Sequence, residues 1–135
     1  MTKLTGQCLC GNVKFEADGE PSIVANCHCT DCQQASGSPY ATLIFMERED
    51  VKVTGKVSTF SHKVSSGNEL TKHFCPTCGS QMFASNEARP TSIGLRGGTV
   101  NEKEHVKPQF NVYTSSKIDS TPLDPDLPAF DKMPG

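Results

Sequence analysis

The cysteines constrain this sequence more than any other feature, because all seven fall in three short clusters. The clusters read Cys8-Leu9-Cys10, Cys27-His28-Cys29-Thr30-Asp31-Cys32 and Cys75-Pro76-Thr77-Cys78. An odd number of cysteines cannot pair off completely as disulfides, and close spacing of this kind is typical of metal sites. Inert buried cysteines would be scattered along the chain instead. The clusters therefore predict bound metal, and thiolate ligands at these spacings favour zinc.

The first and last clusters together supply four thiolates. In a C-x-C pair on an extended segment both sulfurs point to one face, and a C-x-x-C pair on a tight turn directs its two sulfurs to one ion. Gly79 directly follows Cys78 and suits the sharp turn that such a knuckle needs. Because zinc prefers four tetrahedral ligands, we expect a closed structural site of Cys8, Cys10, Cys75 and Cys78. This site would close a long loop of the chain, which is where a metal clip stabilises a fold most.

The middle cluster leaves three thiolates, those of Cys27, Cys29 and Cys32. Three protein ligands with an open fourth position form the pattern of a catalytic zinc site. A closed site completed by His62 or His73 is one alternative to this interpretation. A redox-active C-x-x-C pair within the cluster is another, although the βαβ pattern that accompanies redox motifs is missing.

The choice of ligands in the middle cluster also predicts chemistry. Three thiolates donate much negative charge to zinc and leave it a weak Lewis acid, so water is activated poorly. Such a site is better matched to a soft fourth ligand, such as the thiolate of a substrate. Zinc holds a bound thiol deprotonated at neutral pH. We therefore expect the site to handle a small thiol or its adduct, rather than to hydrolyse a bond with metal hydroxide.

Length and charge limit the classes of function. A chain of 135 residues argues for one domain. The net charge of −2 argues against nucleic acid as a partner, and we interpret the basic pairs His62-Lys63 and Lys72-His73 as solvated strand edges. No stretch is apolar enough for a membrane span, and the first residues lack the apolar core of a signal peptide. These features favour a protein of the cytoplasm, a compartment in which disulfides are disfavoured.

Short alternating patterns predict a mainly β fold. Apolar and polar residues alternate around Val13 and Phe15, and further short apolar runs are separated by Gly, Pro, Asn and Ser. One helical turn is expected from Thr30 to Ala35. We divide the chain into a zinc-binding domain, residues 1–114, and a Pro- and Asp-rich tail, residues 115–135, that extends over the same domain. A disordered tail is the alternative, given its polar composition.

Two further segments are candidates for binding substrate. Ser36, Gly37 and Ser38 follow the three-cysteine cluster, and their small side chains would leave room above an open metal. Backbone N–H groups there would also suit an anionic ligand, although an ordinary turn explains the same residues. Arg96 could hold a carboxylate with its guanidinium, whereas the simpler alternative is an arginine that faces water.

Three motifs of this sequence resemble one known family. Residues 6–15, from Gly6-Gln7-Cys8-Leu9-Cys10 onward, are similar to the opening of the glutathione-dependent formaldehyde-activating enzymes. The middle cluster followed by Ser36-Gly37-Ser38-Pro39-Tyr40 resembles the central motif of the family, and Phe74-Cys75-Pro76-Thr77-Cys78-Gly79-Ser80 resembles its second knuckle. All three clusters match in order and spacing, over residues 6–83, with weaker similarity in the tail.

The resemblance implies a β-tent, or Mss4-like, fold of short antiparallel strands and two zinc ions per chain. It implies the same partition into a structural zinc at the four-cysteine site and a catalytic zinc at Cys27, Cys29 and Cys32. The activity it implies is that of a carbon–sulfur lyase, which in reverse combines glutathione and formaldehyde into S-hydroxymethylglutathione. The implied partners are therefore a small thiol, such as glutathione, and a small aldehyde.

A non-catalytic interaction module is the alternative function. The β-tent fold also serves proteins that bind partners, and a fold does not determine a function. That interpretation predicts a closed second metal site, or no second metal, together with an exposed apolar patch.

Overall fold

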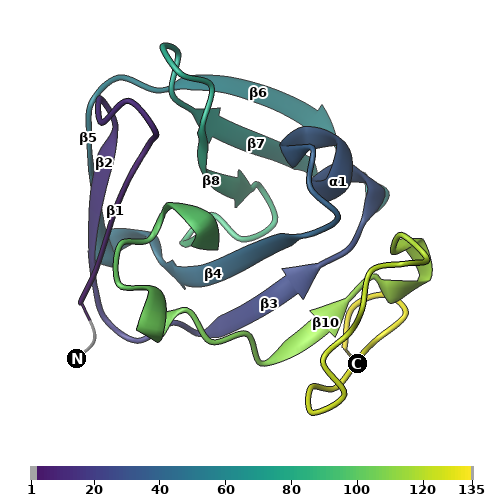
Figure 1. Ribbon diagram of the computed structural model, residues 1–135. Helices are drawn as coiled ribbons and strands as arrows, with labels where there is room; N and C mark the ends of the chain where they lie inside the picture. The colour runs from purple at the N-terminus through teal and green to yellow at the C-terminus, as the bar shows by residue number, and fades with distance from the viewer. Residues whose placement is uncertain (1–2, 135) are drawn as a thin grey trace.

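The computed structural model describes residues 3–134, in which ten strands and one α-helix make up most of the regular structure (Figure 1). The strands are β1 (Lys3–Gln7), β2 (Lys14–Asp18), β3 (Ile23–Cys27), β4 (Ala41–Glu47), β5 (Val51–Thr54), β6 (Ser58–Lys63), β7 (Glu69–Phe74), β8 (Gln81–Asn86), β9 (Ser92–Arg96) and β10 (Phe110–Val112). The helix α1 spans Thr30–Ser36, which confirms the helical turn expected from Thr30 to Ala35. The fold is mainly β, as predicted.

The strands form two sheets. The smaller sheet has the order β1-β2-β5, and the larger has the order β10-β3-β4-β9-β8-β7-β6. All strand pairs are antiparallel except β10 with β3. In Figure 1 the small sheet lies at one side of the large one, and α1 lies beside the ends of β7 and β8. Two largely antiparallel sheets of short strands, together with the cysteine clusters, correspond to the β-tent architecture.

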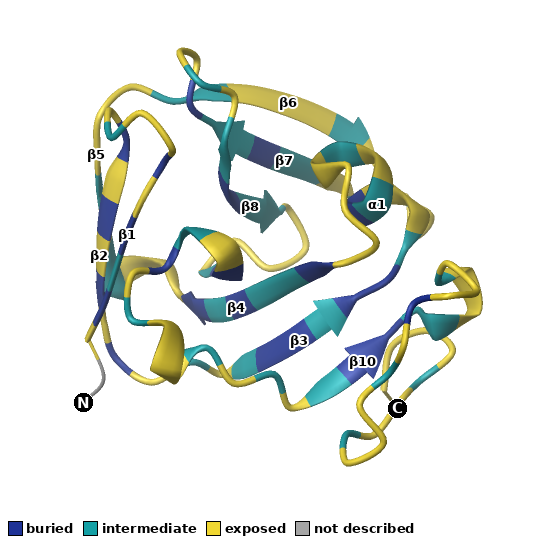
Figure 2. Cartoon of the chain, viewed as in Figure 1, coloured by how far each residue is buried: buried dark blue, intermediate teal, exposed yellow. Residues whose placement is uncertain are grey.

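One hydrophobic core joins the two sheets. Strand β2 alternates strictly, since Phe15 and Ala17 are buried while Lys14, Glu16 and Asp18 are exposed, as period-two geometry requires of a strand with one covered face. Buried side chains of β4, β8 and β9 belong to the same cluster: Ile44, Met46, Met82, Phe83, Ile93 and Leu95. Figure 2 shows this burial along the central strands and the exposed character of β6 at the edge.

A second, smaller core lies around the middle cysteine cluster. Parallel pairing places Val112 of β10 opposite Cys27 of β3. Ala25, Cys32 and Ala41 complete the buried part of this cluster. The C-terminal strand therefore supports the segment from which the middle cluster begins.

The segment after β10 returns along the same edge of the large sheet. Asn111 donates a backbone hydrogen bond to Pro128 at 2.9 Å and accepts one from Phe130 at 2.9 Å. The ring of Phe130 packs edge-on against Phe110, with ring centroids 5.7 Å apart. The division of the chain into a domain of residues 1–114 and a tail of residues 115–135 stays a prediction.

One interpretation of the basic residues needs correction. Strand β6, which carries His62, is the edge strand of the large sheet, as expected for a solvated pair. Lys72 is instead buried, with 6% of its surface exposed. Strand β7 is not an edge, because it is paired with β6 on one side and with β8 on the other. The flanking strands therefore cover Lys72, which period-two sequence patterns alone did not indicate.

Candidate metal centres

The first and last cysteine clusters meet at one point. The ligand atoms of Cys8, Cys10, Cys75 and Cys78 all lie within 4.8 Å of one another. Cys8 and Cys10 follow β1, while Cys75 and Cys78 form the turn between β7 and β8. Gly79 adopts a φ of 78°, a left-handed conformation that favours glycine, and its N–H donates to the Cys75 carbonyl at 2.8 Å. The tight turn predicted for this knuckle is therefore present.

The spacing of these sulfurs suits zinc. The Sγ atoms of Cys8 and Cys10 are 3.6 Å apart, and those of Cys10 and Cys75 are 3.7 Å apart. A tetrahedron with Zn–S bonds of about 2.3 Å has edges of about 3.8 Å. The backbone N–H of Val13 also donates to the Cys8 sulfur at 3.2 Å, which stabilises a thiolate there. The four-cysteine cluster thus fits a closed tetrahedral site.

The middle cluster is assembled by the junction of β3 and α1. Cys27 ends β3, Cys29 is the residue that caps the N-terminus of α1, and Cys32 lies in the first turn of the helix. Their ligand atoms also lie within 4.8 Å of one another. The Cys29 sulfur accepts a hydrogen bond from the Cys32 backbone N–H at 3.3 Å, in the manner of an ordinary N-cap side chain.

Within residues 3–134, no histidine or carboxylate joins this three-cysteine group. His73 stacks on the ring of Phe83 with centroids 4.3 Å apart, and His62 instead contacts Lys72. His28 is buried, and its Nε2 lies 2.9 Å from the Asn111 side-chain oxygen. The described part of the chain therefore offers no fourth protein ligand for the middle cluster.

The electrostatics of the middle cluster favour a cation. Hydrogen bonds from the Cys27 thiol, and then from the Cys32 thiol, hold the pKa of Cys29 far below its usual range. Donating to Cys29, and next to Cys32, raises the pKa of Cys27. Cys29 is therefore the thiol of the three that ionises most readily. A soft divalent ion would allow all three sulfurs to ionise.

A cavity of about 460 Å³ lies between the end of α1 and the turn that follows β9. Arg96, at the end of β9, lines this cavity with 8% of its surface exposed. Its Nε and Nη1 atoms are buried and have no hydrogen-bond partner. Buried guanidinium nitrogens without partners are costly, and an anion bound in the cavity would offset that cost. The alternative of an arginine that faces water does not describe Arg96.

The other predicted substrate residues lie beside α1. Ser36 and Ser38 line the same cavity as Arg96. The Ser36 hydroxyl donates to the Cys32 carbonyl at 2.6 Å and accepts from the Ser38 N–H at 3.1 Å. Gly37 ends the helix with a φ of 72°, and its N–H donates to the Gln33 carbonyl at 2.8 Å. The loop is therefore a helix C-cap whose two serines face the cavity.

Sequence patterns missed two groups near the middle cluster. Tyr113 is the one residue other than glycine within residues 3–134 with a positive φ, 56°. Tyr113 packs against the small core that contains Cys27 and Cys32. Burial, followed by the charges of Cys27, Cys29 and Cys32, raises the pKa of its phenol. The second group is the buried Lys72. A tyrosine after a three-residue strand carries no pattern that would have identified it.

Fold and clusters together define the class: a small β-tent protein with two cysteine clusters whose geometry suits metal. The model of the glutathione-dependent formaldehyde-activating enzyme family matches residues 3–116, and the chain belongs to this family. A crystal structure of a Rhodobacter sphaeroides protein shares the fold, with a TM-score of 0.57 and 20% identity over 77% of this chain and 96% of that chain. Within residues 3–134, no helix combines the length and apolar character needed to cross a membrane.

Proposed function

We propose that this protein is a zinc-dependent carbon–sulfur lyase that makes and breaks the adduct of a small thiol and a small aldehyde. Family membership suggests glutathione and formaldehyde as the pair, with S-hydroxymethylglutathione as the adduct. The observation that carries the proposal is the middle cluster of Cys27, Cys29 and Cys32, which has no fourth ligand among the described residues. A non-catalytic interaction module predicts instead either a closed second metal site or no second metal.

Zinc bound by these three cysteines would supply stabilisation of a substrate thiolate and an open position for its sulfur. The chain itself contributes orientation. The N-cap role of Cys29 and the helical position of Cys32 hold two of the sulfurs on one rigid turn. Orientation of a thiol and an aldehyde against each other is a large part of what a two-substrate reaction requires.

The Arg96 cavity would hold the remainder of the thiol. Glutathione carries two carboxylates, and a carboxylate is the natural partner for the unpaired Nε and Nη1 of Arg96. Ser36 and Ser38 offer polar atoms on the facing wall. The positive charge of Arg96 also opposes the raised pKa of Cys32, which supports a guanidinium close to the metal cluster.

Exchange NMR on glutathione, formaldehyde and their adduct, with the zinc-loaded protein, tests the activity. We expect acceleration that disappears in Cys29→Ser with the fold intact. To test the cavity, the reaction rates of the wild type and of the Arg96→Lys variant are compared with glutathione as the thiol and again with 2-mercaptoethanol as the thiol. Loss of rate for glutathione alone supports the carboxylate role. No acceleration by the zinc-loaded wild type would refute the glutathione–formaldehyde reaction, and an equal loss for both thiols would refute the role of Arg96.

A further inference from the structure

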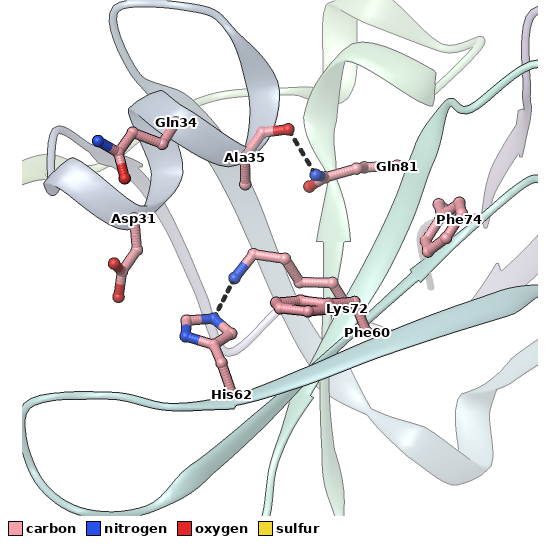
Figure 3. A pocket seen from close by; sticks show the side chains of 8 residues that line it. All are labelled: Asp31, Gln34, Ala35, Phe60, His62, Lys72, Phe74 and Gln81. Atoms are coloured by element: carbon pink, nitrogen blue, oxygen red, sulfur yellow. Dashed lines mark hydrogen bonds between the residues drawn. The ribbon is translucent and has the colours of Figure 1, made fainter.

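A second cavity, of about 380 Å³, lies between α1 and the strands β6 and β7 (Figure 3). Asp31 and Gln34 of α1 form one wall, and Phe60 and His62 of β6 form part of the other. Lys72 of β7 extends between the two walls toward His62 (Figure 3). None of the seven cysteines lines this cavity, and the function proposed above does not use it.

Lys72 is an unusual residue to find there. Its amine lies within hydrogen-bonding distance of His62 Nε2, which accepts from the amine in the tautomer that leaves Nε2 without a proton. The ion pairs in residues 3–134 are Lys3 with Glu16 and His105 with Glu104, so no carboxylate forms one with Lys72. A buried ammonium without a carboxylate partner is unfavourable, and the amine can relieve this by losing its proton.

The surroundings act on the charge of Lys72 in both directions. Burial, followed by the nearby charge of Arg96, lowers the pKa of the amine. The negative groups of α1 act against this: Asp31 first, then Cys32 and Cys29. A cation bound to the two cysteines would cancel part of their charge and so weaken that opposition. Lys72 is therefore more often a free amine at neutral pH than a surface lysine is.

We propose that Lys72 binds a small aldehyde covalently and reversibly, as an imine, inside this cavity. The choice of an aldehyde rests on the function proposed above, which needs one as co-substrate. The geometry is independent of that function: a buried amine lies on the wall of a cavity, next to a proton carrier, and the aromatic rings of Phe60 and Phe74 line the same cavity. Lysine amines freed from their proton by burial are the usual Schiff-base nucleophiles.

The chemistry balances without any oxidant or metal. The nitrogen lone pair of Lys72 attacks the carbonyl carbon, the N–C bond forms, and the carbonyl oxygen takes up a proton to give a carbinolamine. The hydroxyl then leaves as water and the protonated imine forms. His62 is placed to accept the proton that the nitrogen loses and to pass it to the carbonyl oxygen; a second proton, taken from solvent through the same imidazole, reaches the departing hydroxyl. Addition of water reverses both steps and releases the aldehyde.

Reductive trapping tests the proposal on the zinc-loaded full chain. The protein is exposed at pH 7 to dilute ¹³C-formaldehyde with cyanoborohydride, and methylation of each lysine is followed by peptide mass spectrometry. Lys14 and Lys52, which are exposed, serve as internal controls. Each unit by which a pKa is lowered raises the fraction of free amine about tenfold at pH 7. We expect Lys72 to react severalfold faster than either control.

Variants separate a reactive amine from an accessible one. His62→Gln keeps a hydrogen-bond acceptor for Lys72 but cannot carry a proton, so labelling of Lys72 should slow by about tenfold or more while Lys14 is unaffected. Lys72→Arg removes the reactive amine and should leave the labelling of Lys14 and Lys52 unchanged. Labelling of Lys72 at the rate of the exposed lysines, or more slowly, in the folded wild type would overturn the proposal. Because no thiol substrate is added in this experiment, its outcome for the imine does not depend on whether the protein has lyase activity.

Discussion

Removing the metal cross-link between the first and last cysteine clusters should destabilise the protein, because the long loop of chain between them is then no longer closed in the unfolded state. The double variant Cys8→Ser/Cys10→Ser removes both ligands on one side of the four-cysteine site. Cys10 and Cys75 are 65 residues apart in sequence. The chain-entropy model for a cross-link of that length gives about 4 kcal/mol of stabilisation.

The middle cluster supplies a matched control. The double variant Cys29→Ser/Cys32→Ser removes the same number of thiols, but its cluster spans only residues 27–32. The same model gives about 2 kcal/mol for so short a loop. The first variant should therefore lose about 2 kcal/mol more than the second, which corresponds to a urea midpoint lower by about 1 M.

Urea unfolding followed by circular dichroism measures both losses, with bound zinc determined in parallel. The gap between the two variants should close when both are unfolded in the presence of a chelator, because the metal link is then absent from each. Equal losses for the two variants with zinc bound would refute the argument from loop length. A gap that persists in chelator would assign the difference to packing of Cys8, which is buried.

Three other predictions concern the scaffold. Glu102 accepts hydrogen bonds from the Thr5 hydroxyl at 2.6 Å and from the Thr5 N–H at 2.7 Å, and these lower the pKa of its carboxyl group. The stabilisation by the carboxylate is complete above the unfolded pKa of about 4.3 and is lost as the pH falls through the lower pKa of the folded state. In unfolding experiments, Glu102→Gln should therefore lower the free energy of unfolding by about 1 kcal/mol at pH 7, and by almost nothing at a pH below both pKa values. Ile44 is fully buried, so Ile44→Ala should lose about 2–5 kcal/mol and Ile44→Val about 1 kcal/mol in urea unfolding, and equal losses would contradict the packing described. Gly55 has a φ of 96° and faces the Asn12 carbonyl, so Gly55→Ala should lower stability by about 2 kcal/mol or more, whereas an unchanged melting temperature would contradict that backbone conformation.

The sequence predicted the fold class and the grouping of the cysteines because both depend on local rules. Alternation around Phe15 revealed β2, and the spacing of the clusters revealed which sulfurs could meet. Strand order could not be predicted, since pairing of β10 with β3 joins Val112 to Cys27 across most of the chain. A pairing between residues so far apart in sequence produces no pattern that is visible within a few consecutive residues.

The environment of single polar residues was the other part that sequence reasoning missed. Lys72 alternates with its neighbours like any solvated strand residue, and its burial results from β6, β8 and α1 closing over it. Arg96 was identified as a candidate, but its unpaired nitrogens become apparent only when the surrounding polar atoms have positions. Burial of a charge is a property of the assembled fold and not of the local pattern.

The separation of Cys8 from Cys78 has a consequence for synthesis of the chain. At about 5–20 residues per second, the ribosome needs about 4–14 s to add the 70 residues between them. During that interval the thiols of Cys8 and Cys10 have left the ribosome, or are about to, without the partners with which they converge in the folded protein. Strand β10, which covers the middle cluster, is made later still. A nascent chain with open thiols is exposed to oxidation and to the wrong metal, so the supply of reductant and zinc during translation should govern the yield of correctly folded protein.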